Sequence, residues 1–337
     1  MRDAIQKILD ELTNQNDNRL SVFNLQVKGL DKGTLSLSGS LLNRDQLQAL
    51  KEALSHHFPD LSVDTDPIRI LHHPNLPCFH VATNLTGLYE KPTFGMALSS
   101  ELTFGTELEI LDEQRSWVFT RQKDGYLGWA YKPFLAEGEA SGATDLIIAP
   151  SYELRAQPTM TSEVITRLMS GTGVRLQETQ GEWTKVIANK MGWMPSKYLR
   201  ALSDIPKSSE EKRKIIIEDS QRMIGIPYLW GGTSGNGIDC SGFARLLHRW
   251  IGVQIPRDAD MQHKAAKTVE PPFEAGDLFF FAEKDSNRKI THVGVSLGGW
   301  KLIHSSRSNN GVYMDDLAQR KSLMDIFVSA GSFIRDT

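Results

Sequence analysis

Residues 225–247 read GIPYLWGGTSGNGIDCSGFARLL and place Cys240, one of two cysteines in the chain, between a glycine-rich turn and a segment with helical spacing. Unpaired backbone N–H groups and the helix dipole favour an anion at the start of a helix. The thiolate is the nucleophilic form of cysteine, and glycine lets a backbone turn sharply and approach a substrate closely. We therefore expect Cys240 to begin a helix as a stabilised, nucleophilic thiolate.

A nucleophilic thiol needs a base, and the base needs a group that orients it. Residues 289–299 (KITHVGVSLGG) and 300–306 (WKLIHSS) have the alternation of buried strands, and each segment carries one histidine. Histidines on adjacent strands can lie side by side, so that His292 faces the thiol and His304 hydrogen-bonds to His292. The residues predict a triad of Cys240, His292 and His304, with histidine in the third place.

Each of these residues also has a simpler interpretation. A lone cysteine before a helix is usually a small buried hydrophobe, and His292 by itself could be a core histidine. The glycine-rich turn contains neither of the two common phosphate-binding glycine patterns. The combination of motifs therefore favours nucleophilic catalysis over packing or phosphate binding.

The composition limits the class of protein. The chain has 337 residues, 40% of them hydrophobic and 23% charged, with a formal net charge of -3, which is typical of a soluble protein of about two to four domains. The charge gives no reason to expect binding to nucleic acid or to an anionic membrane surface. No run of about 18 apolar residues predicts a membrane span.

The cysteines and the first residues bear on the compartment. Residues 1–17 (MRDAIQKILDELTNQND) have the spacing of an amphipathic helix with acids inside it, unlike the apolar centre of a signal peptide. Cys78 and Cys240 are far apart and form no metal-type cluster. We expect a reduced, cytoplasmic protein with neither a metal nor a cofactor.

Two segments of the chain resemble each other. LYEKP at residues 88–92 matches LRAQP at 154–158, and each is followed by a Gly-Thr pair, a tryptophan and a closing Gly-Trp. Short alternating strands with turn residues between them predict a small β-barrel for each copy. The pattern looks like bacterial SH3 domains, which we place at residues 80–138 and 145–203.

The segments on either side of the repeats complete the domain organisation. Residues 1–75 mix a helix, a strand pair, a second helix with Asn43 as its N-cap, and a strand VDTDPIRIL. We expect a small α+β domain there, vaguely similar to the BON domains of bacterial envelope proteins. SDIPKSSEEKRK then predicts a linker into the last domain, at residues 212–337.

Five motifs follow one another in the last third of the chain: PYLWGG…DCSGF, PR, GDLFFF, HVGV and IHSS. Together they resemble the NlpC/p60 cysteine peptidases, a circularly permuted papain-like family. The resemblance implies a multidomain α+β protein: a small N-terminal domain, two SH3-like barrels and a papain-like catalytic domain. Members with tandem bacterial SH3 domains resemble γ-D-glutamyl-L-diamino acid endopeptidases, which cut the D-Glu to diamino acid bond of peptidoglycan peptides.

The resemblance also implies roles. Cys240 is the nucleophile, His292 the base and His304 the orienter, and the Tyr228 hydroxyl joins the Cys240 backbone N–H at the oxyanion site. Ala259 stands where the family pattern has a hydroxyl. The candidate substrate contacts are Trp230, Asp239, Ser241, Arg257 and Asp258.

The duplication adds two further candidates. At matched positions the first copy has Glu90 and Tyr126 where the second has Ala156 and Lys190. In the resembling endopeptidases the first SH3 domain closes one end of the groove, where an acid and a tyrosine hold the free amino group of L-Ala. The resemblance implies this role for Glu90 and Tyr126, which would otherwise be ordinary surface residues.

We therefore expect a cysteine endopeptidase that takes murein peptides of the form L-Ala-γ-D-Glu-diamino acid in cell-wall recycling. One alternative is an exported hydrolase of polymeric peptidoglycan. Another is a non-catalytic module that anchors to the wall through its SH3 domains. The intact triad favours an enzyme.

Overall fold

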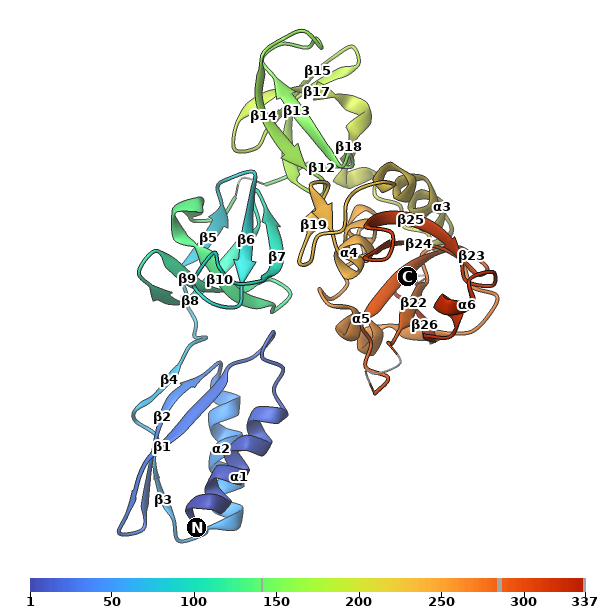
Figure 1. The fold of residues 1–337 in the computed structure, drawn as a ribbon. Coiled ribbons are helices and arrows are strands. Elements are labelled where there is room, and N and C mark those ends of the chain that lie inside the picture. The colour runs from blue at the N-terminus through green and yellow to red at the C-terminus, as the bar shows by residue number, and fades with distance from the viewer. Residues whose placement is uncertain (141, 284–286, 336–337) are drawn as a thin grey trace. The chain divides into compact units, whose positions relative to one another are not determined.

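A computed structural model of the protein describes residues 1–140, 142–283 and 287–335 (Figure 1). The chain forms two compact units, one of residues 1–79 and 107–133, the other of residues 80–106 and 134–337. The second unit contains Cys240 and both histidines of the predicted triad. No helix among the described residues is long and apolar enough to cross a membrane.

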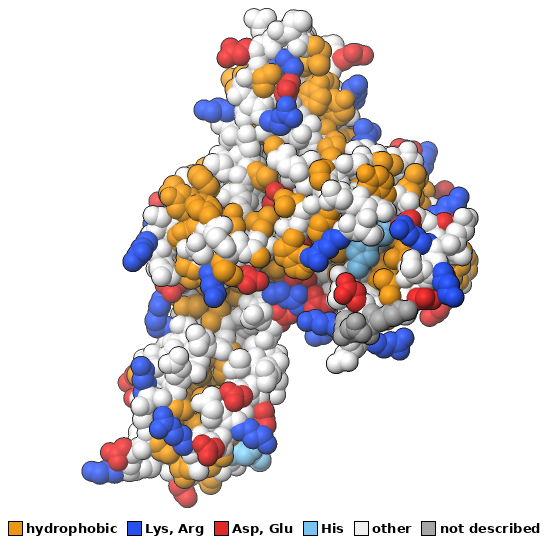
Figure 2. Space-filling model, in the orientation of Figure 1, with side chains coloured by type: hydrophobic (Ala, Val, Ile, Leu, Met, Phe, Trp, Pro, Cys, Tyr) orange, Lys and Arg blue, Asp and Glu red, His pale blue; other side chains and the backbone are white. Residues whose placement is uncertain are grey.

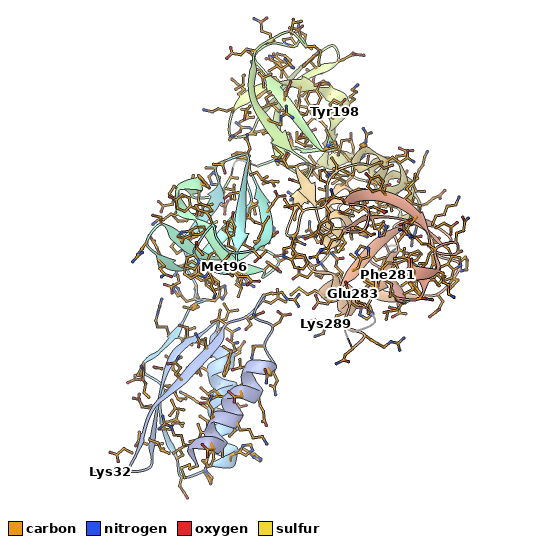
Figure 3. The ribbon with its side chains drawn as sticks, viewed as in Figure 1. Lys32, Met96, Tyr198, Phe281, Glu283 and Lys289 are labelled. Atoms are coloured by element: carbon orange, nitrogen blue, oxygen red, sulfur yellow. The ribbon has the colours of Figure 1, made fainter. Side chains whose placement is uncertain are left out.

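The N-terminal domain has two helices against a four-stranded sheet. Its elements are α1 (Arg2–Asn14), β1 (Phe23–Asp31), β2 (Thr34–Leu41), α2 (Arg44–His57), β3 (Ser62–Asp64) and β4 (Ile68–Ile70). The predicted helices and strand pair are confirmed, but VDTDPIRIL forms two short strands instead of one. β3 and β4 both run parallel to β2, pairing with its beginning and its end, so the chain leaves the sheet between them. Lys32 lies at the tip of the β1–β2 hairpin (Figure 3).

The start of α2 has the cap that the sequence predicted. The Asn43 side chain accepts a hydrogen bond from the Gln46 backbone N–H at 3.1 Å, and the Gln46 side chain accepts one from the Asn43 N–H at 3.2 Å. This reciprocal pair is a capping box, which satisfies two backbone donors at the start of the helix. Leu50 and Leu54 on the same helix are fully buried in the domain core.

The two repeats have the same strand order. The first copy consists of β5 (Cys78–Val81), β6 (Leu85–Tyr89), β7 (Leu98–Thr103), β8 (Glu107–Gln114), β9 (Trp117–Gln122), β10 (Leu127–Tyr131) and β11 (Leu135–Glu137). The second consists of β12 (Asp145–Ile147), β13 (Ser151–Arg155), β14 (Val164–Met169), β15 (Gly173–Gln180), β16 (Trp183–Ile187), β17 (Met191–Pro195) and β18 (Leu199–Ala201). The sheet orders are β11-β5-β8-β9-β10-β6-β7 and β18-β12-β15-β16-β17-β13-β14. Each strand therefore has a counterpart at the same place, which confirms the internal duplication.

The catalytic domain packs helices against a six-stranded sheet of order β21-β26-β22-β23-β24-β25. The strands of this sheet are β21 (Lys267–Val269), β22 (Leu278–Phe281), β23 (His292–Gly298), β24 (Lys301–Ser306), β25 (Gly311–Asp316) and β26 (Phe327–Ser332). β19 (Thr233–Ser234) and β20 (Gly237–Ile238) pair separately with each other. Its helices are α3 (Ser209–Ser220), α4 (Cys240–Trp250), α5 (Ala259–Ala265) and α6 (Lys321–Met324). α3 begins earlier than RKIIIEDSQRMIG predicts, because the Ser208 side chain caps it by accepting from the Glu211 N–H.

The second barrel is built into the catalytic unit. The Trp250 indole N–H at the end of α4 donates to the Ile147 carbonyl at 3.1 Å. Arg200 of β18 pairs with the buried Asp219 of α3 at 2.7 Å, and Ile148 belongs to the same apolar cluster as Trp250. The second barrel therefore contributes Ile148 to the core around α4 and is joined to α3 and α4 by polar contacts.

The face of the molecule drawn in Figure 2 shows side chains of both charges. On the face drawn in Figure 2, basic and acidic side chains alternate with hydrophobic ones. This distribution fits the formal net charge of -3 and offers no basic stripe of the kind that follows a nucleic-acid backbone.

The capping box gives a test of the N-terminal domain. Replacing Asn43 by Ala should destabilise α2 by about 1 kcal/mol, because one backbone donor loses its partner. Hydrogen exchange of the 44–57 segment, followed by mass spectrometry, should then run about fivefold faster under native conditions. Lys51→Ala on the exposed side of the same helix is the matched control and should leave exchange unchanged. Equal exchange in both variants would mean that the cap does not stabilise this helix.

Candidate active site

Cys240 is the first residue of α4, and Asp239 is the N-cap. The Asp239 carboxylate accepts a hydrogen bond from the Gly242 N–H at 2.6 Å, which satisfies one of the unpaired donors in the first turn. The helix packs against β23 and β24, the two strands that carry His292 and His304. The N-cap at Asp239 therefore places the Cys240 thiol at the first position of a helix that packs against the two histidine strands.

The ionisation of Cys240 differs from the sequence-based expectation. The thiol is only 8% exposed, and burial, with the charge of Asp239 beside it, raises its pKa to about 12. Hydrogen bonds from the Val293 and Ser241 N–H groups act in the opposite direction but do not outweigh burial. The expectation of a stabilised thiolate is wrong for the free protein. Desolvation raises the pKa of the thiol by more than the N-terminal end of the helix lowers it.

The glycines of the turn serve close packing inside the protein. A Cβ on Gly231 would lie 2.3 Å from the Leu98 carbonyl oxygen of β7, and one on Gly235 would lie 2.1 Å from the Pro150 carbonyl oxygen of the second barrel. Gly231 also has a φ of +77°, which disfavours other residues. In the free protein, the close approach that these glycines permit is that of Leu98 and Pro150, one from each SH3 barrel, to the turn before Cys240.

The two histidines lie side by side on neighbouring strands. His292 Nε2 and His304 Nδ1 are 2.7 Å apart, and His304 Nε2 lies 2.8 Å from a carboxylate oxygen of Asp315 on β25. The other oxygen of Asp315 accepts a hydrogen bond from Arg320. Phe281 of β22, labelled in Figure 3, lies against the His292 ring with centroids 5.5 Å apart. The hydrogen bond from His304 holds the pKa of Asp315 below its usual range.

These contacts determine where the ring protons sit. An ionised Asp315 can only accept, so His304 carries its proton on Nε2 and leaves Nδ1 as an acceptor. His292 then donates from Nε2, and its Nδ1 keeps a free lone pair. Burial and the neighbouring His304 lower the pKa of His292 to about 3, so the ring is neutral at neutral pH. A neutral imidazole with a free Nδ1 can act as the general base for a thiol nucleophile.

Asp315 is a functional residue that the sequence analysis missed. β24 pairs antiparallel with β25, so that His304 faces Tyr313 and Leu302 faces Asp315. Residues two apart on a strand share a face, which brings the carboxylate to the diagonal position beside His304. An acid on the strand after IHSS was the available signal, but the register decides which residue of the Asp315–Asp316 pair reaches the ring.

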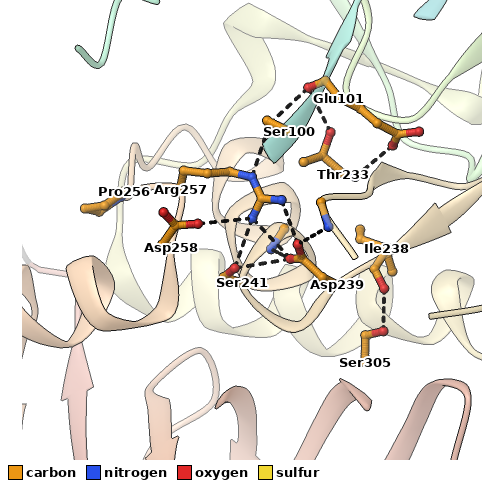
Figure 4. A network of polar contacts seen from close by, with 12 residues as sticks. Ser100, Glu101, Thr233, Ile238, Asp239, Ser241, Pro256, Arg257, Asp258 and Ser305 are labelled. Carbon is orange, nitrogen blue, oxygen red and sulfur yellow. Dashed lines mark hydrogen bonds and ion pairs between the residues drawn. The ribbon is translucent and has the colours of Figure 1, made fainter. Parts of the chain in front are cut away.

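Arg257 joins the nucleophile helix to the first barrel (Figure 4). The side chain is 1% exposed and donates to Asp239 at 2.7 and 3.1 Å, to the Ser241 hydroxyl at 3.0 Å and to the Ser100 hydroxyl of β7 at 3.1 Å. Next to it, Glu101 accepts from the Thr233 N–H at 2.8 Å. Arg257 and Asp239, predicted as substrate contacts, are occupied with each other and with the barrel in the free protein.

The remaining candidates lie in several environments. Trp230 is 57% exposed and Tyr228 is half-buried. Tyr126 is 4% exposed. Asp258 is the N-cap residue of α5, and Ala259 is the first residue of that helix. Their roles toward a substrate stay predictions.

Glu90 can be placed more closely, because it follows the Tyr89–Leu98 pair at the end of β6. The Leu98 carbonyl lies against Gly231, so this end of the barrel meets the turn that leads to Cys240. Glu90 itself is exposed. No hydrogen bond or ion pair joins it to another residue of the part of the chain that the structure describes.

A cysteine at the start of a helix, packed against a strand that carries a hydrogen-bonded histidine, is the arrangement of a cysteine peptidase. Residues 225–328 match the NlpC/P60 family, residues 152–200 the bacterial SH3 domain and residues 88–130 the bacterial dipeptidyl-peptidase SH3 domain. The chain belongs to the NlpC/P60 family of cysteine peptidases, with two bacterial SH3 domains ahead of the catalytic domain.

Named relatives share most of this arrangement. A γ-D-glutamyl-L-lysine dipeptidyl-peptidase of Bacillus subtilis (strain 168) is 30% identical over 226 residues, which cover 64% of this chain and 74% of the relative. A protein of the same name from Bacillus cereus (strain ATCC 10987 / NRS 248) is 27% identical over 233 residues, 64% of this chain and 69% of the relative. The crystal structure of an NlpC/P60 family protein from Bacillus cereus ATCC 10987 has the same fold, with a TM-score of 0.67 at 21% identity, covering 77% of this chain and all of that one.

The Asp315 contact predicts a large effect on turnover. Asp315→Asn removes the charge that fixes the His304 tautomer, so kcat should fall about a hundredfold or more with little change in KM. Asp315→Glu should recover part of the loss. Asp316→Asn, which changes the adjacent acid on the same strand, is the matched control and should retain most activity. Similar kinetics for the two Asn variants would remove Asp315 from the mechanism.

The raised pKa of Cys240 predicts how the thiol reacts in the free protein. Below a pKa of about 12, the thiolate fraction grows about tenfold for each pH unit. Alkylation of Cys240 by iodoacetamide, followed by peptide mass spectrometry to separate it from Cys78, should therefore rise steadily between about pH 7 and pH 10. A rate that is already constant across this range would instead indicate a preformed thiolate–imidazolium pair.

Proposed function

We propose that the protein is a cysteine endopeptidase that cleaves the bond between γ-D-Glu and the diamino acid in cell-wall peptides with a free N-terminal L-Ala. The observation that carries the proposal is the hydrogen-bonded series His292–His304–Asp315, whose two histidines lie on the strands that pack against the helix of Cys240. The names of the two Bacillus relatives supply the substrate class. Their similarity extends over 64% of this chain, which is more than the catalytic domain alone occupies.

The chemistry follows from the neutral resting pair. As the Cys240 sulfur attacks the γ-carbonyl carbon, His292 Nδ1 takes the thiol proton and becomes an imidazolium. His304 and Asp315 stabilise that charge through the two short hydrogen bonds. Collapse of the tetrahedral intermediate breaks the carbon–nitrogen bond, and His292 returns the proton to the leaving amine. Water, activated by the same histidine, then hydrolyses the thioester and frees Cys240.

Tyr228 has the properties of an oxyanion donor. Burial raises the pKa of its phenol to about 12, so the hydroxyl keeps its proton through the neutral and mildly alkaline range. A neutral phenol can donate to the oxygen that becomes negative in the tetrahedral intermediate, alongside the Cys240 backbone N–H. This assignment gives Tyr228 a role in the transition state and not in the fold alone.

Selection of a free amine is assigned to Glu90. Glu90 is supported by its exposure, by its lack of a partner among the described residues and by its position beside the Leu98–Gly231 contact. A carboxylate pairs well with an ammonium and poorly with an acylated amine. Ser241 and Asp258 are assigned to the substrate side of the same site, whereas Arg257 and Asp239, which pair with each other, are assigned to positioning the start of α4.

We place this activity in the recycling of small peptides in the cytoplasm. The proposal is supported by the two cysteines, which are both free thiols, as expected in a reducing compartment. The competing function is hydrolysis of intact wall, for which the relative named bifunctional muramidase/DL-endopeptidase CwlT is the precedent, at 32% identity over 40% of this chain. The two functions differ in whether the substrate amine is free.

The free amine provides the decisive measurement. The enzyme should cleave L-Ala-γ-D-Glu-L-Lys and should reject the same peptide when its amine is acetylated. Glu90→Gln should lower kcat/KM for the free peptide by roughly ten- to a hundredfold, because a charge-assisted pair is lost. Glu163→Gln, an exposed acid of the second barrel, is the control. Cys240→Ala should abolish hydrolysis of every peptide.

The same assay separates the alternatives. Comparable cleavage of the free and acetylated peptides would contradict the recycling assignment and favour a hydrolase of intact wall. Full activity of Cys240→Ala would contradict the cysteine mechanism, and a wild-type protein that binds wall fragments without cutting any of them would leave only a binding module.

A further inference from the structure

Arg307 lies over the two aromatic rings of the PYLWGG segment, those of Tyr228 and Trp230. The guanidinium carbon is 5.6 Å from the centroid of the Tyr228 ring and 5.0 Å from that of Trp230, and Arg307 also hydrogen-bonds to Tyr228. Aromatic faces hold a cation in place without neutralising it. The arrangement therefore positions a positive charge and leaves it available.

Arg307 differs in this respect from two other arginines of the same domain. Arg257 is paired with Asp239, and Arg320 with Asp315. No carboxylate pairs with Arg307 among the residues that the structure describes. The side chain is exposed, and so is Trp230 beside it. A fixed, exposed guanidinium with no anionic partner is suited to an anionic group that arrives with a ligand.

The position of Arg307 relative to the reacting groups is fixed by the backbone. Arg307 follows β24, three residues after His304, and the intervening Ser305 donates to the Ile238 carbonyl at 2.6 Å (Figure 4). Ile238 in turn lies two residues before Cys240. The segment that carries the guanidinium is thus tied to the segment that carries the nucleophile.

A second connection holds the aromatic rings on the same side. The Tyr228 N–H donates to the Asn310 carbonyl at 3.3 Å, and Pro227 forms a β-bridge with Gly311. Gly311 permits this approach, because a Cβ there would lie 2.4 Å from the Ile226 carbonyl oxygen. Backbone contacts therefore join the turn with Arg307 to the turn with Tyr228 and Trp230.

We propose that Arg307, held over Tyr228 and Trp230, is the carboxylate-binding residue of the substrate site. The inference rests on the proposed function, because γ-linked peptides carry a free α-carboxylate on the D-Glu residue next to the scissile bond. The diamino acid offers a second one when it ends the peptide. A guanidinium binds either group through two parallel hydrogen bonds, which an uncharged amide cannot reproduce.

The experiment compares three peptides that differ only in these groups. The first is L-Ala-γ-D-Glu-L-Lys, the second has the D-Glu α-carboxylate replaced by a carboxamide, and the third ends in L-lysinamide. The wild type should prefer the first peptide over one of the two amides by about ten- to a hundredfold in kcat/KM. The amide that suffers identifies which carboxylate Arg307 binds.

Arg307→Gln should abolish that preference, so that the first peptide and the affected amide are cleaved at similar low rates. Arg307→Lys, which keeps the charge but not the fork, should retain an intermediate preference. Lys301→Gln removes an exposed cation from the other end of β24 and should leave the preference unchanged. The iodoacetamide reactivity of Cys240 should be the same in all four proteins, which shows that the nucleophile is intact.

The outcomes separate the two proposals. An Arg307→Gln enzyme that still discriminates against the same amide as strongly as the wild type overturns the role of Arg307 and leaves the proposed function standing. Equal cleavage of all three peptides by the wild type would likewise overturn the role of Arg307 and leave the proposed function standing. If the wild type cleaves none of the peptides, and Cys240→Ala binds none in calorimetry, the proposed function fails and the Arg307 site fails with it.

Discussion

The buried ion pair between Arg257 and Asp239 is the interaction on which the rest of the site depends. Asp239 caps the helix that begins with Cys240, and Arg257 holds Asp239, Ser241 and Ser100 of the first barrel at the same time. An arginine that is 1% exposed is stable only when its charge is paired. Removing either partner of such a pair typically costs about 3 to 5 kcal/mol, since the other charge stays buried. The position of the nucleophile, the shape of its turn and the contact with the barrel are therefore maintained by one network.

Strand β7 of the first barrel and the second barrel both contact the catalytic domain closely. Strand β7 meets the turn at Gly231, and the second barrel meets it at Gly235, with no room for a side chain at either position. Trp250 and Arg200 attach the second barrel to the far ends of α4 and α3. A barrel that only anchored the enzyme to its substrate would need no such fit. Strand β7 and the second barrel therefore both contact the turn that precedes the nucleophile.

Burial also determines how the catalytic pair works. Desolvation raises the pKa of the Cys240 thiol and lowers that of the His292 ring in the free protein, and in the proposed mechanism the ion pair forms as the substrate reacts. Asp315, ionised and hydrogen-bonded to His304, is the group that makes this possible, because it stabilises the imidazolium at the end of a continuous series of hydrogen bonds. The stabilisation is realised in the transition state and not in the ground state, which is where it lowers the barrier.

The sequence by itself determined the elements that depend on local pattern: the helix that starts at Cys240, the N-cap at Asn43, the duplication, and the strands that carry His292 and His304. Each of these follows from spacing within one short segment. The tertiary structure alone decided the rest. Asp315 reaches His304 because of the register between β24 and β25, the glycines fit carbonyl groups of distant barrels, and the ionisation of Cys240 depends on how completely other segments exclude water from it. These properties depend on contacts between residues far apart in the chain, and short-range pattern carries no information about them.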